Sequence, residues 1–322
     1  MHNEIPEVTI ATVCYNVVKS GRANLFRNCV DSISSQSCRS VEHLVVDGGS
    51  ADGTVDLLRE CERPGFRWLS EKDNGIYDAM NKAIRLAAGK YLAFINSDDM
   101  LSDIGAVAAV KAALDESGAD FVYANANVYS ADHSQLIRTW KSRIDDIPYG
   151  YYPCHQTVFC RTDVLREIGG FSEEYMANDN LLMLRLVDRY KAHYLDRVVV
   201  NFHEGGASEA MVANKDRMKE ETVSFFHDEV GKRCGLTRED CERLYEMQCF
   251  YLSDEEVIDI GTRLGSPVWT RRYFEVFMNM RKQSFDQERQ NIVADYERRL
   301  MDSHRVIRLK LFGRIPLFRV DV

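Results

Sequence analysis

Proline, glycine and long apolar runs are all scarce in this sequence of 322 residues. It has 6 prolines and 19 glycines, which excludes collagen-like and low-complexity chains. No stretch approaches the roughly 18 apolar residues of a membrane-spanning helix, and residues 1–7 have neither the cationic nor the apolar region of a signal peptide. We therefore expect a globular protein that is neither exported nor threaded through a membrane.

Positive charge is also in short supply. The 41 Lys and Arg residues are outnumbered by 50 Asp and Glu residues, for a formal net charge of -9, so no overall positive field attracts nucleic acid. The nine cysteines include no Cys-x-x-Cys pair, which argues against a disulfide framework or a zinc knuckle and favours a reducing cytoplasm. Cys234, Cys241 and Cys249 suit one face of a helix, where buried cysteines are commoner than metal ligands.

Two common phosphate-binding motifs are missing. The sequence contains neither Gly-x-Gly-x-x-Gly nor Gly-x-x-x-x-Gly-Lys-Ser/Thr. Neither a Rossmann dinucleotide site nor a P-loop therefore supplies backbone amides for a phosphate. Any bound anion must be neutralised in another way.

Short β-branched or aromatic runs alternate with helical patterns up to about residue 205, which predicts an α/β fold with a mostly parallel sheet. Strands are expected at 8–15, 41–46, 66–70, 91–95, 121–125, 157–160 and 193–202. Helices are expected at 23–34, 54–62, 76–88, 104–114, 163–168 and 179–190. Gly89 is expected to be a left-handed cap, and residues 128–140 indicate a hairpin or an extended excursion.

Helix-forming residues dominate after this region. Thr237 marks one helix start, and Ser253 marks another as a capping box with Glu256. One long amphipathic helix is expected from Trp269 to about Ser303. We expect three parts: a sheet domain over 1–208, a helical appendix over 209–303, and a tail over 304–322 in which basic and large apolar residues alternate.

The predicted strands end in polar residues. These ends are Cys14-Tyr15-Asn16, Asp47-Gly48-Gly49-Ser50, Ser70-Glu71-Lys72-Asp73-Asn74 and Asn96-Ser97-Asp98-Asp99. Because ligands of an open α/β sheet bind beyond the carboxyl ends of its strands, they form one candidate site. Asp98 and Asp99 suit Mg²⁺ or Mn²⁺, which take oxygen ligands and leave positions for diphosphate oxygens. For this pair alone, the alternative is a turn that caps the following helix.

Four motifs, in this order and spacing, resemble those of bacterial family-2 glycosyltransferases with the GT-A fold. They are Thr12-Val13-Cys14-Tyr15-Asn16, the turn from Asp47 to Thr54, the block from Ser70 to Ala83, and Asn96-Ser97-Asp98-Asp99. The resemblance covers about residues 6–208 and implies a three-layer α/β/α domain. It also implies a nucleotide-sugar donor, a divalent cation and an inverting transfer to an acceptor hydroxyl.

The resemblance places the nucleotide sugar against these strand ends. Asp47 is expected to accept a hydrogen bond from the ring N–H of the base, which uracil and thymine offer and adenine does not, and this favours UDP. The other residues expected to bind the nucleotide sugar are Thr12, Cys14, Asn16, Asp78, Lys82, Asn96, Ser97 and Asp98. Asp78 and Lys82 lie one helical turn apart, where the alternative is a surface ion pair.

By the same resemblance, Asp99 is the direct ligand of Mn²⁺ or Mg²⁺, and Asp98 lies nearer the ribose or beside the ion. Many relatives carry Asp where this chain has Asn96, which is expected to bond the ribose instead. His203 lies in a stretch, 202–208, that resembles a mobile Gly-Gly loop closing over the diphosphate, and it is a third candidate ligand. The cation would neutralise the leaving group without proton transfer.

The acceptor hydroxyl must lose a proton, and residues 175–185 resemble the family's base-bearing segment. Asp179 is the predicted base, and Asn178 is a predicted sugar or acceptor contact. A helix cap, the alternative for Asp179, is compatible with that role. His155 and Gln156 match a dipeptide that we assign to donor-sugar or acceptor contact, and the alternative for His155 is a structural role.

These expectations describe a metal-dependent hexosyl- or N-acetylhexosaminyl-transferase. The tail resembles those of relatives that build cell-surface polysaccharides on lipid-linked acceptors, which implies capsule, exopolysaccharide or lipopolysaccharide synthesis at the inner face of the plasma membrane. A tail docked on its own protein is the alternative.

Two other functions stay open. A sugar-1-phosphate nucleotidyltransferase shares the α/β architecture, but it needs a Gly-rich basic loop that residues 14–22 lack. A non-catalytic nucleotide- or glycan-binding scaffold is suggested by the helical appendix, by Asn96, and by Leu181, where relatives often have a second Asp.

Overall fold

The computed structural model describes residues 5–205, 214–245 and 253–280. Contacts between residues divide the chain into two units. The first takes its described residues from Met1–Ser142 and Tyr152–Met218, and the second from Arg143–Tyr151 and Lys219–Val322. A short segment from the middle of the chain therefore belongs with the helices that follow the sheet.

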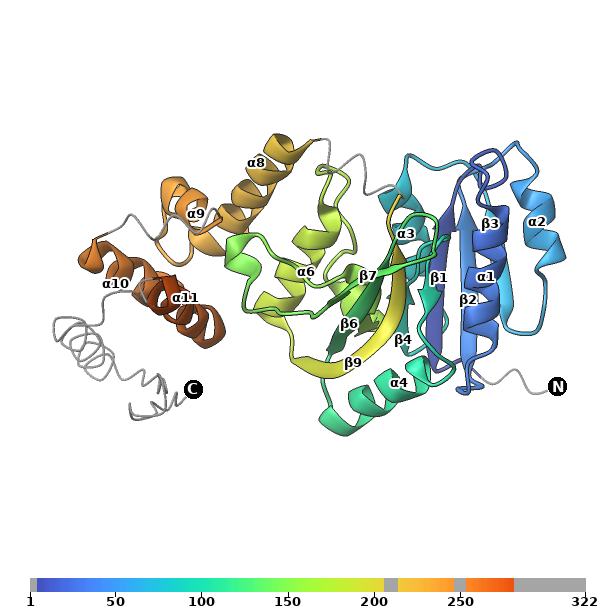
Figure 1. Ribbon diagram of the computed structural model, residues 1–322, viewed down its shortest axis with the longest axis horizontal. Coiled ribbons are helices and arrows are strands. Elements are labelled where there is room, and N and C mark those ends of the chain that lie inside the picture. The colour runs from blue at the N-terminus through green and yellow to red at the C-terminus, as the bar shows by residue number, and fades with distance from the viewer. Residues whose placement is uncertain (1–4, 206–213, 246–252, 281–322) are drawn as a thin grey trace. The chain divides into compact units, whose positions relative to one another are not determined.

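The first unit contains a sheet of nine strands in the order β3-β2-β1-β4-β8-β6-β9-β5, with β7 paired to β6 (Figure 1). The strands are β1 (Val8–Cys14), β2 (Val41–Asp47), β3 (Phe66–Ser70), β4 (Tyr91–Phe94), β5 (Met100–Leu101), β6 (Phe121–Tyr129), β7 (Leu136–Trp140), β8 (Val158–Arg161) and β9 (Ala192–His203). β1 to β4 pair in parallel, β8 is antiparallel to both β4 and β6, and β9 is parallel to β6. Six strands thus run in one direction and β5, β7 and β8 in the other, which confirms the predicted α/β fold with a mostly parallel sheet.

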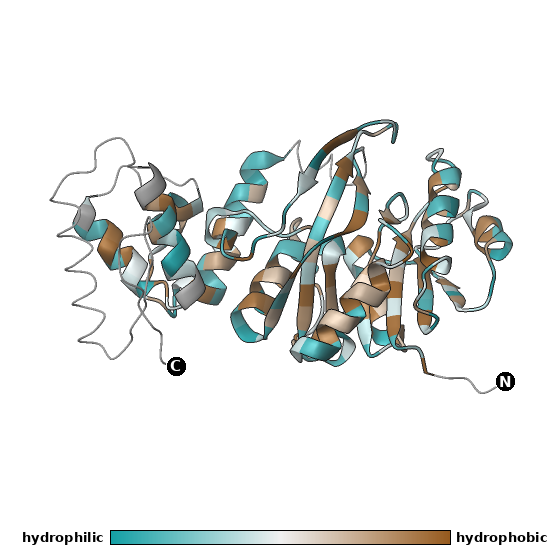
Figure 2. Ribbon diagram, turned by 60° about the horizontal axis from the view of Figure 1, so that its bottom comes forward, coloured by the Kyte–Doolittle hydropathy of each residue, from teal (hydrophilic) through white to brown (hydrophobic). Residues whose placement is uncertain are grey.

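Helices cover both faces of this sheet. They are α1 (Ala23–Ser34), α2 (Thr54–Glu60), α3 (Ile76–Leu86), α4 (Ala106–Ser117), α5 (Thr162–Glu167) and α6 (Asn178–Arg189), with a short 3-10 helix η2 (His155–Thr157) before β8. Successive strand residues point to opposite faces. Ile10 of β1 and Ala93 of β4 join Cys29 of α1 and Val110 of α4 in one apolar cluster, so α1 and α4 cover the same face. The central strands are largely brown in Figure 2, with white and teal stretches among them.

The opposite face carries α3. Phe94, the neighbour of Ala93 on β4, contacts Phe171 with ring centroids 5.4 Å apart, and Phe171 stacks on Tyr77 of α3 at 5.5 Å. Asn81 of α3 donates to the carbonyl of Phe171 and accepts from its backbone N–H, both at 2.8 Å. These contacts fix the chain that leads into α6.

Most predicted elements are confirmed, including the helix at 23–34 and the strand at 66–70. Residues 128–140 form the hairpin of β6 and β7. The two-residue strand β5 was not predicted. The left-handed conformation expected for Gly89 is wrong, because its φ is not positive. Glycine is needed there for space, since a Cβ would lie 2.5 Å from the backbone nitrogen of Thr9.

The second unit is helical in its described part. Its elements are η1 (Ile147–Tyr149), the π-helical turn η3 (His227–Gly231), α9 (Arg238–Tyr245), α10 (Asp254–Arg263) and α11 (Pro267–Met280), while α8 (Lys215–Phe226) spans the division between the units. The capping box predicted for Ser253 and Glu256 is confirmed. Thr237 and Asp240 exchange backbone-to-side-chain hydrogen bonds at the start of α9.

Buried aromatic and charged groups join the segment 143–151 to α11 within this unit. Trp269 is buried and its indole N–H donates to the carbonyl of Ile144 at 3.3 Å. Arg272 pairs with Asp146 at 2.5 Å. A salt bridge and an indole contact thus hold two segments that lie far apart in the sequence.

The remainder of the expected long helix and the tail over 304–322 lie outside the described residues. The division into 1–208, 209–303 and 304–322 stays a prediction. Across the ranges that the structure describes, every helix is too short or too polar to cross a membrane.

Candidate functional site

The parallel strands bring their carboxyl ends to one edge of the sheet, which we call the carboxyl edge. Cys14 ends β1, Asp47 ends β2, Ser70 ends β3 and His203 ends β9. Asp98 and Asp99 lie just beyond β4. Because all these strands run in the same direction, residues far apart in the sequence meet there.

Asp47 is completely buried and holds three strand ends together. Its Oδ1 accepts from the hydroxyl of Ser50 at 2.5 Å, and its Oδ2 accepts from the backbone N–H of Ser50 at 2.9 Å and the hydroxyl of Ser70 at 2.6 Å. Burial, and then the charge of Asp47, raise the pKa of Cys14, whose thiol lies 3.8 Å from Oδ1. Because hydroxyls can rotate, Ser50 or Ser70 can release an oxygen to another donor.

Thr12 and Asn16 differ in what they offer a ligand. Thr12 is completely buried and its hydroxyl lies 3.0 Å from Nε2 of His43, so it has no open face at the carboxyl edge. Burial, followed by the charge of Arg63, lowers the pKa of His43 to about 3 and keeps its ring neutral. Asn16 takes a left-handed φ of 50°, and its backbone N–H donates to the hydroxyl of Ser50 at 2.7 Å. Asn16 thus shapes the turn beside Asp47.

Asp78 and Lys82 form the ion pair that was the alternative to a binding role, at 3.7 Å. The Lys82 ammonium also lies 3.0 Å from Glu71 and donates to the carbonyl of Lys72 at 2.8 Å. Asp78 accepts from the backbone N–H of Asn74 at 3.0 Å. The pair therefore fixes the loop that follows β3, and a contact with the donor stays a prediction.

Asp98 shares its buried surroundings with Asp99. Asp98 is 8% exposed, and its Oδ2 lies 2.7 Å from Nη1 of Arg22. Nη2 of Arg22 donates to the carbonyl of Gly205. Burial, and then the charge of Asp99, raise the pKa of Asp98, while Arg22 opposes this. Two adjacent buried carboxylates thus concentrate negative charge that a cation would relieve.

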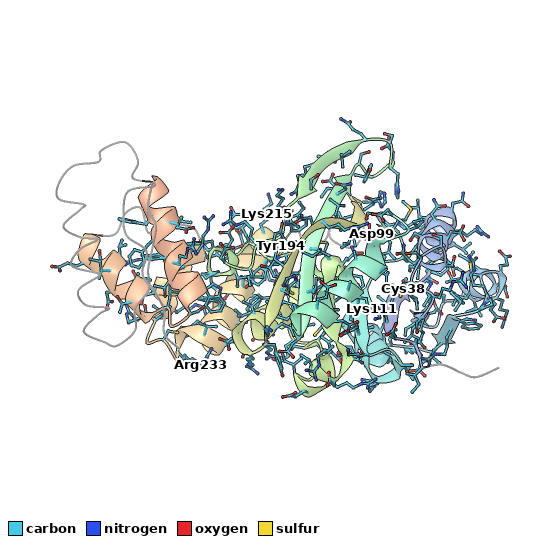
Figure 3. The ribbon with its side chains drawn as sticks, turned by 90° about the horizontal axis from the view of Figure 1, so that it is seen from below. Cys38, Asp99, Lys111, Tyr194, Lys215 and Arg233 are labelled. Carbon is cyan, nitrogen blue, oxygen red and sulfur yellow. The ribbon has the colours of Figure 1, made fainter. Side chains whose placement is uncertain are left out.

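Asp99, labelled in Figure 3, is 1% exposed and held by two donors. Its Oδ2 accepts from the amide of Gln156 at 2.5 Å, and its Oδ1 accepts from the backbone N–H of His203 at 2.6 Å. The amide oxygen of Gln156 accepts from the backbone N–H of Asn96 at 2.9 Å. Gln156, predicted to contact a sugar, is completely buried and uses both ends of its amide to position Asp99 and Asn96. Ser97 is partly buried in the same turn.

The residues around Asp99 fit a divalent cation that arrives with a diphosphate. In the described ranges, no three His, Cys, Asp or Glu side chains form a complete ligand group. Mg²⁺ and similar cations usually take one or two carboxylates and complete their shell with phosphates and water. Asp98 and Asp99 supply such carboxylates, and Nδ1 of His203 is buried without a hydrogen bond, 3.4 Å from Oδ1 of Asp99.

Asp179 lies in the first turn of α6 with its side chain 21% exposed. Its Oδ2 is 3.2 Å from Nδ1 of His155, and the hydroxyl of Tyr77 is 3.4 Å from its Oδ1. Burial opposes ionisation of Asp179, but the hydrogen bond and charge of His155 outweigh it, and the pKa of Asp179 is lowered. The carboxylate is therefore charged at neutral pH and can accept a proton.

Asn178 and Tyr77 support the turn that carries Asp179. Asn178 is completely buried, its backbone N–H donates to the hydroxyl of Tyr77 at 3.2 Å, and its amide donates to the carbonyl of Tyr175. The Tyr77 hydroxyl donates to the carbonyl of Met176 at 2.7 Å. Burial, and then Asp179, raise the pKa of Tyr77, which stays protonated.

The short helix η2 connects the two carboxylates of the site. Its first residue, His155, contacts Asp179, and its second, Gln156, binds Asp99. The structure thus brings together the predicted base and the predicted metal ligand through neighbouring residues of one helix.

Sequence reasoning missed several residues of the site. Three of them, Ser50, Ser70 and Tyr77, lie inside the recognised motifs. Ser50 and Ser70 bind Asp47, and Tyr77 contacts Asp179, so a hydroxyl within a motif was the signal that could have found them. Arg22 and His133 lie outside every motif. The ring of His133 stacks on His203 with centroids 3.6 Å apart.

Residues 9–166 match the family model described as glycosyl transferase family 2. A "PGL/p-HBAD biosynthesis glycosyltransferase" of Mycobacterium bovis (strain BCG / Pasteur 1173P2) is 30% identical over 200 residues, covering 59% of this chain and 76% of the relative.

Solved structures share the fold. Residues 1–349 of S. aureus TarS, in complex with UDP-GlcNAc, match with a TM-score of 0.55 and 14% identity, covering 98% of this chain and 100% of that one. The mannosyltransferase PcManGT from Pyrobaculum calidifontis, in complex with GDP-Man and Mn2+, matches with a TM-score of 0.54 and 17% identity, covering 93% of this chain and 81% of that one. These structural similarities confirm the expected GT-A fold. The family match and the mycobacterial relative show that the chain belongs to glycosyl transferase family 2.

Proposed function

We propose that this glycosyltransferase moves a hexosyl or N-acetylhexosaminyl group from a nucleotide-diphosphate sugar to an acceptor hydroxyl, with inversion at the anomeric carbon. The observation that carries the proposal is the pair of contacts made by η2. Gln156 positions Asp99 on the donor side, and His155 positions Asp179 on the acceptor side. One short helix thus contacts both the proposed cation-binding carboxylate and the proposed proton-accepting one.

The proposed donor is a UDP-sugar. Asp47 and the two serine hydroxyls around it offer acceptors and donors for the edge of a uracil base. Support comes from TarS, which is solved with UDP-GlcNAc, whereas PcManGT is solved with GDP-Man. UDP-sugars are therefore tested first, and GDP- and dTDP-sugars are tested in the same screen.

On the donor side, Asp99 and Asp98 would hold Mn²⁺ or Mg²⁺, with His203 beside them. When bound, the divalent cation neutralises the charge of the leaving diphosphate. Gln156 and the backbone N–H of His203 keep Asp99 in one orientation. Arg22 compensates the charge of Asp98. These residues hold negative charge at the carboxyl edge. A diphosphate neutralised by a divalent cation is therefore favoured there over a diphosphate dianion without a cation.

On the acceptor side, Asp179 is the proposed base. The acceptor oxygen attacks the anomeric carbon from the face opposite the diphosphate, the bond to the diphosphate oxygen breaks, and the hydroxyl proton passes to Asp179. A carboxylate in this role contributes about 10²- to 10⁴-fold to the rate. His155 keeps Asp179 ionised and oriented, and Tyr77 contacts its second oxygen.

We further propose that the acceptor is a saccharide or a lipid-linked saccharide of a cell-surface glycan. The relative named for PGL/p-HBAD biosynthesis supports a role in assembling a larger product. The basic and apolar composition of residues 304–322 suits contact with an anionic inner leaflet.

The experiment is a donor screen with product analysis. Wild-type protein is incubated with UDP-, GDP- and dTDP-sugars, Mn²⁺ and a panel of alkyl glycosides. Nucleotide release and glycoside mass are measured, and NMR gives the anomeric configuration of the product. We expect a UDP-sugar to be consumed with an inverted product. Asp179→Asn should lose transfer. Asp103→Asn is the control and should keep transfer, because it also removes one negative charge but does so at an exposed residue that pairs with Arg197. Transfer with retained configuration, or equal transfer by Asp179→Asn, would refute the proposal.

A further inference from the structure

The hairpin of β6 and β7 reaches the carboxyl edge. β6 runs parallel to β9, and Tyr129 at the end of β6 stands opposite His203 in the register. The turn that follows carries His133, whose ring stacks on that of His203 with an interplanar angle of 17°. A residue outside every recognised motif therefore contacts a candidate cation ligand.

The turn that carries His133 is extensively hydrogen bonded. Oδ1 of Asp132 accepts from the hydroxyl of Ser130 at 2.5 Å and from the backbone N–H and hydroxyl of Ser134 at 3.1 and 2.8 Å. The backbone N–H of Ser130 donates to the carbonyl of Gln135 at 2.9 Å. His133 itself takes a φ of 62°, a left-handed conformation that is uncommon outside glycine. Its backbone conformation, fixed by these bonds, directs the ring onto His203.

His203 has little freedom of its own. It is 3% exposed, its backbone N–H is bound to Asp99, and the ring of Tyr129 lies 5.5 Å away. Its Nδ1 makes no hydrogen bond although it lies 3.4 Å from Oδ1 of Asp99. An unsatisfied buried nitrogen is costly, and it is available to a ligand at Asp99. Rotation of the ring would turn this nitrogen away, and the stacked ring of His133 opposes that rotation.

We propose that His133 is a positioning residue of the donor site, which stacks on His203 and holds the Nδ1 edge of that ring beside Asp99. This inference rests on the proposed function, because it takes the cation and the nucleotide of the donor to bind at Asp99. The β6–β7 turn is then a structural part of the donor site. The interaction that matters is the aromatic stacking, and the ring nitrogens of His133 are dispensable.

The test distinguishes the contribution of the aromatic ring of His133 from those of its ring nitrogens and its backbone conformation. His133→Phe keeps a flat ring without nitrogens, and His133→Asn keeps a side chain that tolerates a positive φ but cannot stack. His193→Asn is the control, since His193 is an exposed histidine on β9. Mn²⁺ is titrated by calorimetry into each protein in the presence of a fixed excess of UDP, with the heat of Mn²⁺ binding to UDP alone subtracted, so that the readout is binding without turnover.

We expect His133→Phe to bind Mn²⁺ within about threefold of wild type, and His133→Asn to bind it about tenfold or more weakly, as is usual when a residue that orients a metal ligand is lost. Wild-type affinity in His133→Asn would overturn the inference, and so would a loss in His133→Phe as large as in His133→Asn. If the Asn variant fails to fold, His133→Gly provides the same comparison. Failure of the wild-type protein to bind Mn²⁺ with UDP would instead overturn the proposed function.

Discussion

Asp99 and Asp179, the two carboxylates joined through η2, are held in opposite ways. Asp99 is 1% exposed, and a buried amide and a backbone N–H occupy its two oxygens. Asp179 is 21% exposed and contacts one imidazole closely, with a longer contact to Tyr77 at 3.4 Å. A group that positions a cation benefits from rigidity, whereas a base must present an oxygen to an incoming hydroxyl. The difference supports the proposed division of labour between donor binding and proton transfer.

The largest effect is expected from Asp179→Asn. The amide cannot accept the hydroxyl proton, so kcat for transfer should fall about 10³-fold. UDP affinity should stay within about threefold of wild type, because the change lies on the acceptor side. Steady-state transfer assays and calorimetry on the same sample check both parts. A comparable loss of UDP affinity would show that the two sides are not separable.

A smaller effect is expected from Asp99→Asn, which should raise the KM for the donor by at least about tenfold. The substitution removes the charge that would hold the cation and places an amide against the amide of Gln156. The increase in donor KM should become smaller as the Mn²⁺ concentration is raised, since a weakened cation site can be refilled by mass action. Donor KM is measured across a Mn²⁺ series, with Asp103→Asn as the control. A donor KM that is independent of Mn²⁺ concentration in both Asp99→Asn and Asp103→Asn would contradict the assignment of Asp99 as a cation ligand.

Much of the fold follows from the sequence, because strands and helices are local patterns. β1 and β4 are buried along their whole length, and their largely apolar runs indicate this locally. The Ser253 capping box is likewise set by residues three positions apart. Gln156, in contrast, was expected to contact a sugar, and the segment 143–151 was not expected to pack with α11. Both outcomes depend on partners distant in the chain, Asp99 in one case and Trp269 in the other. Arg22 was missed for the same reason, since its partner Asp98 lies 76 residues away in the chain.

Gln156→Leu should affect both the stability of the protein and the donor side of the site. Loss of the amide leaves the buried backbone N–H of Asn96 and an oxygen of Asp99 without partners, which costs about 1–3 kcal/mol of stability. Transfer should fall by about tenfold through misplacement of Asp99. Thr157→Val, which removes a buried hydroxyl of the same helix that binds only the carbonyl of Cys154, should leave donor KM unchanged. Denaturant unfolding and donor KM distinguish the two variants.

The smallest effect at neutral pH is expected from His155→Leu, and it concerns the acceptor side. His155 lowers the pKa of Asp179 against the opposing effect of burial. Without the imidazole, the pKa of Asp179 rises, so the carboxylate becomes protonated at higher pH. The acid limb of the kcat/KM profile should therefore move to higher pH. A profile that keeps its acid limb would show that His155 does not control the base.

The most direct test of the division between donor and acceptor sides is a calorimetric titration of UDP into three proteins, with Mn²⁺ and again with excess chelator. The account predicts that wild type and Asp179→Asn bind UDP alike and only with Mn²⁺, and that Asp99→Asn binds it much more weakly. UDP binding that needs neither Mn²⁺ nor Asp99, or a loss in Asp179→Asn equal to that in Asp99→Asn, would contradict it.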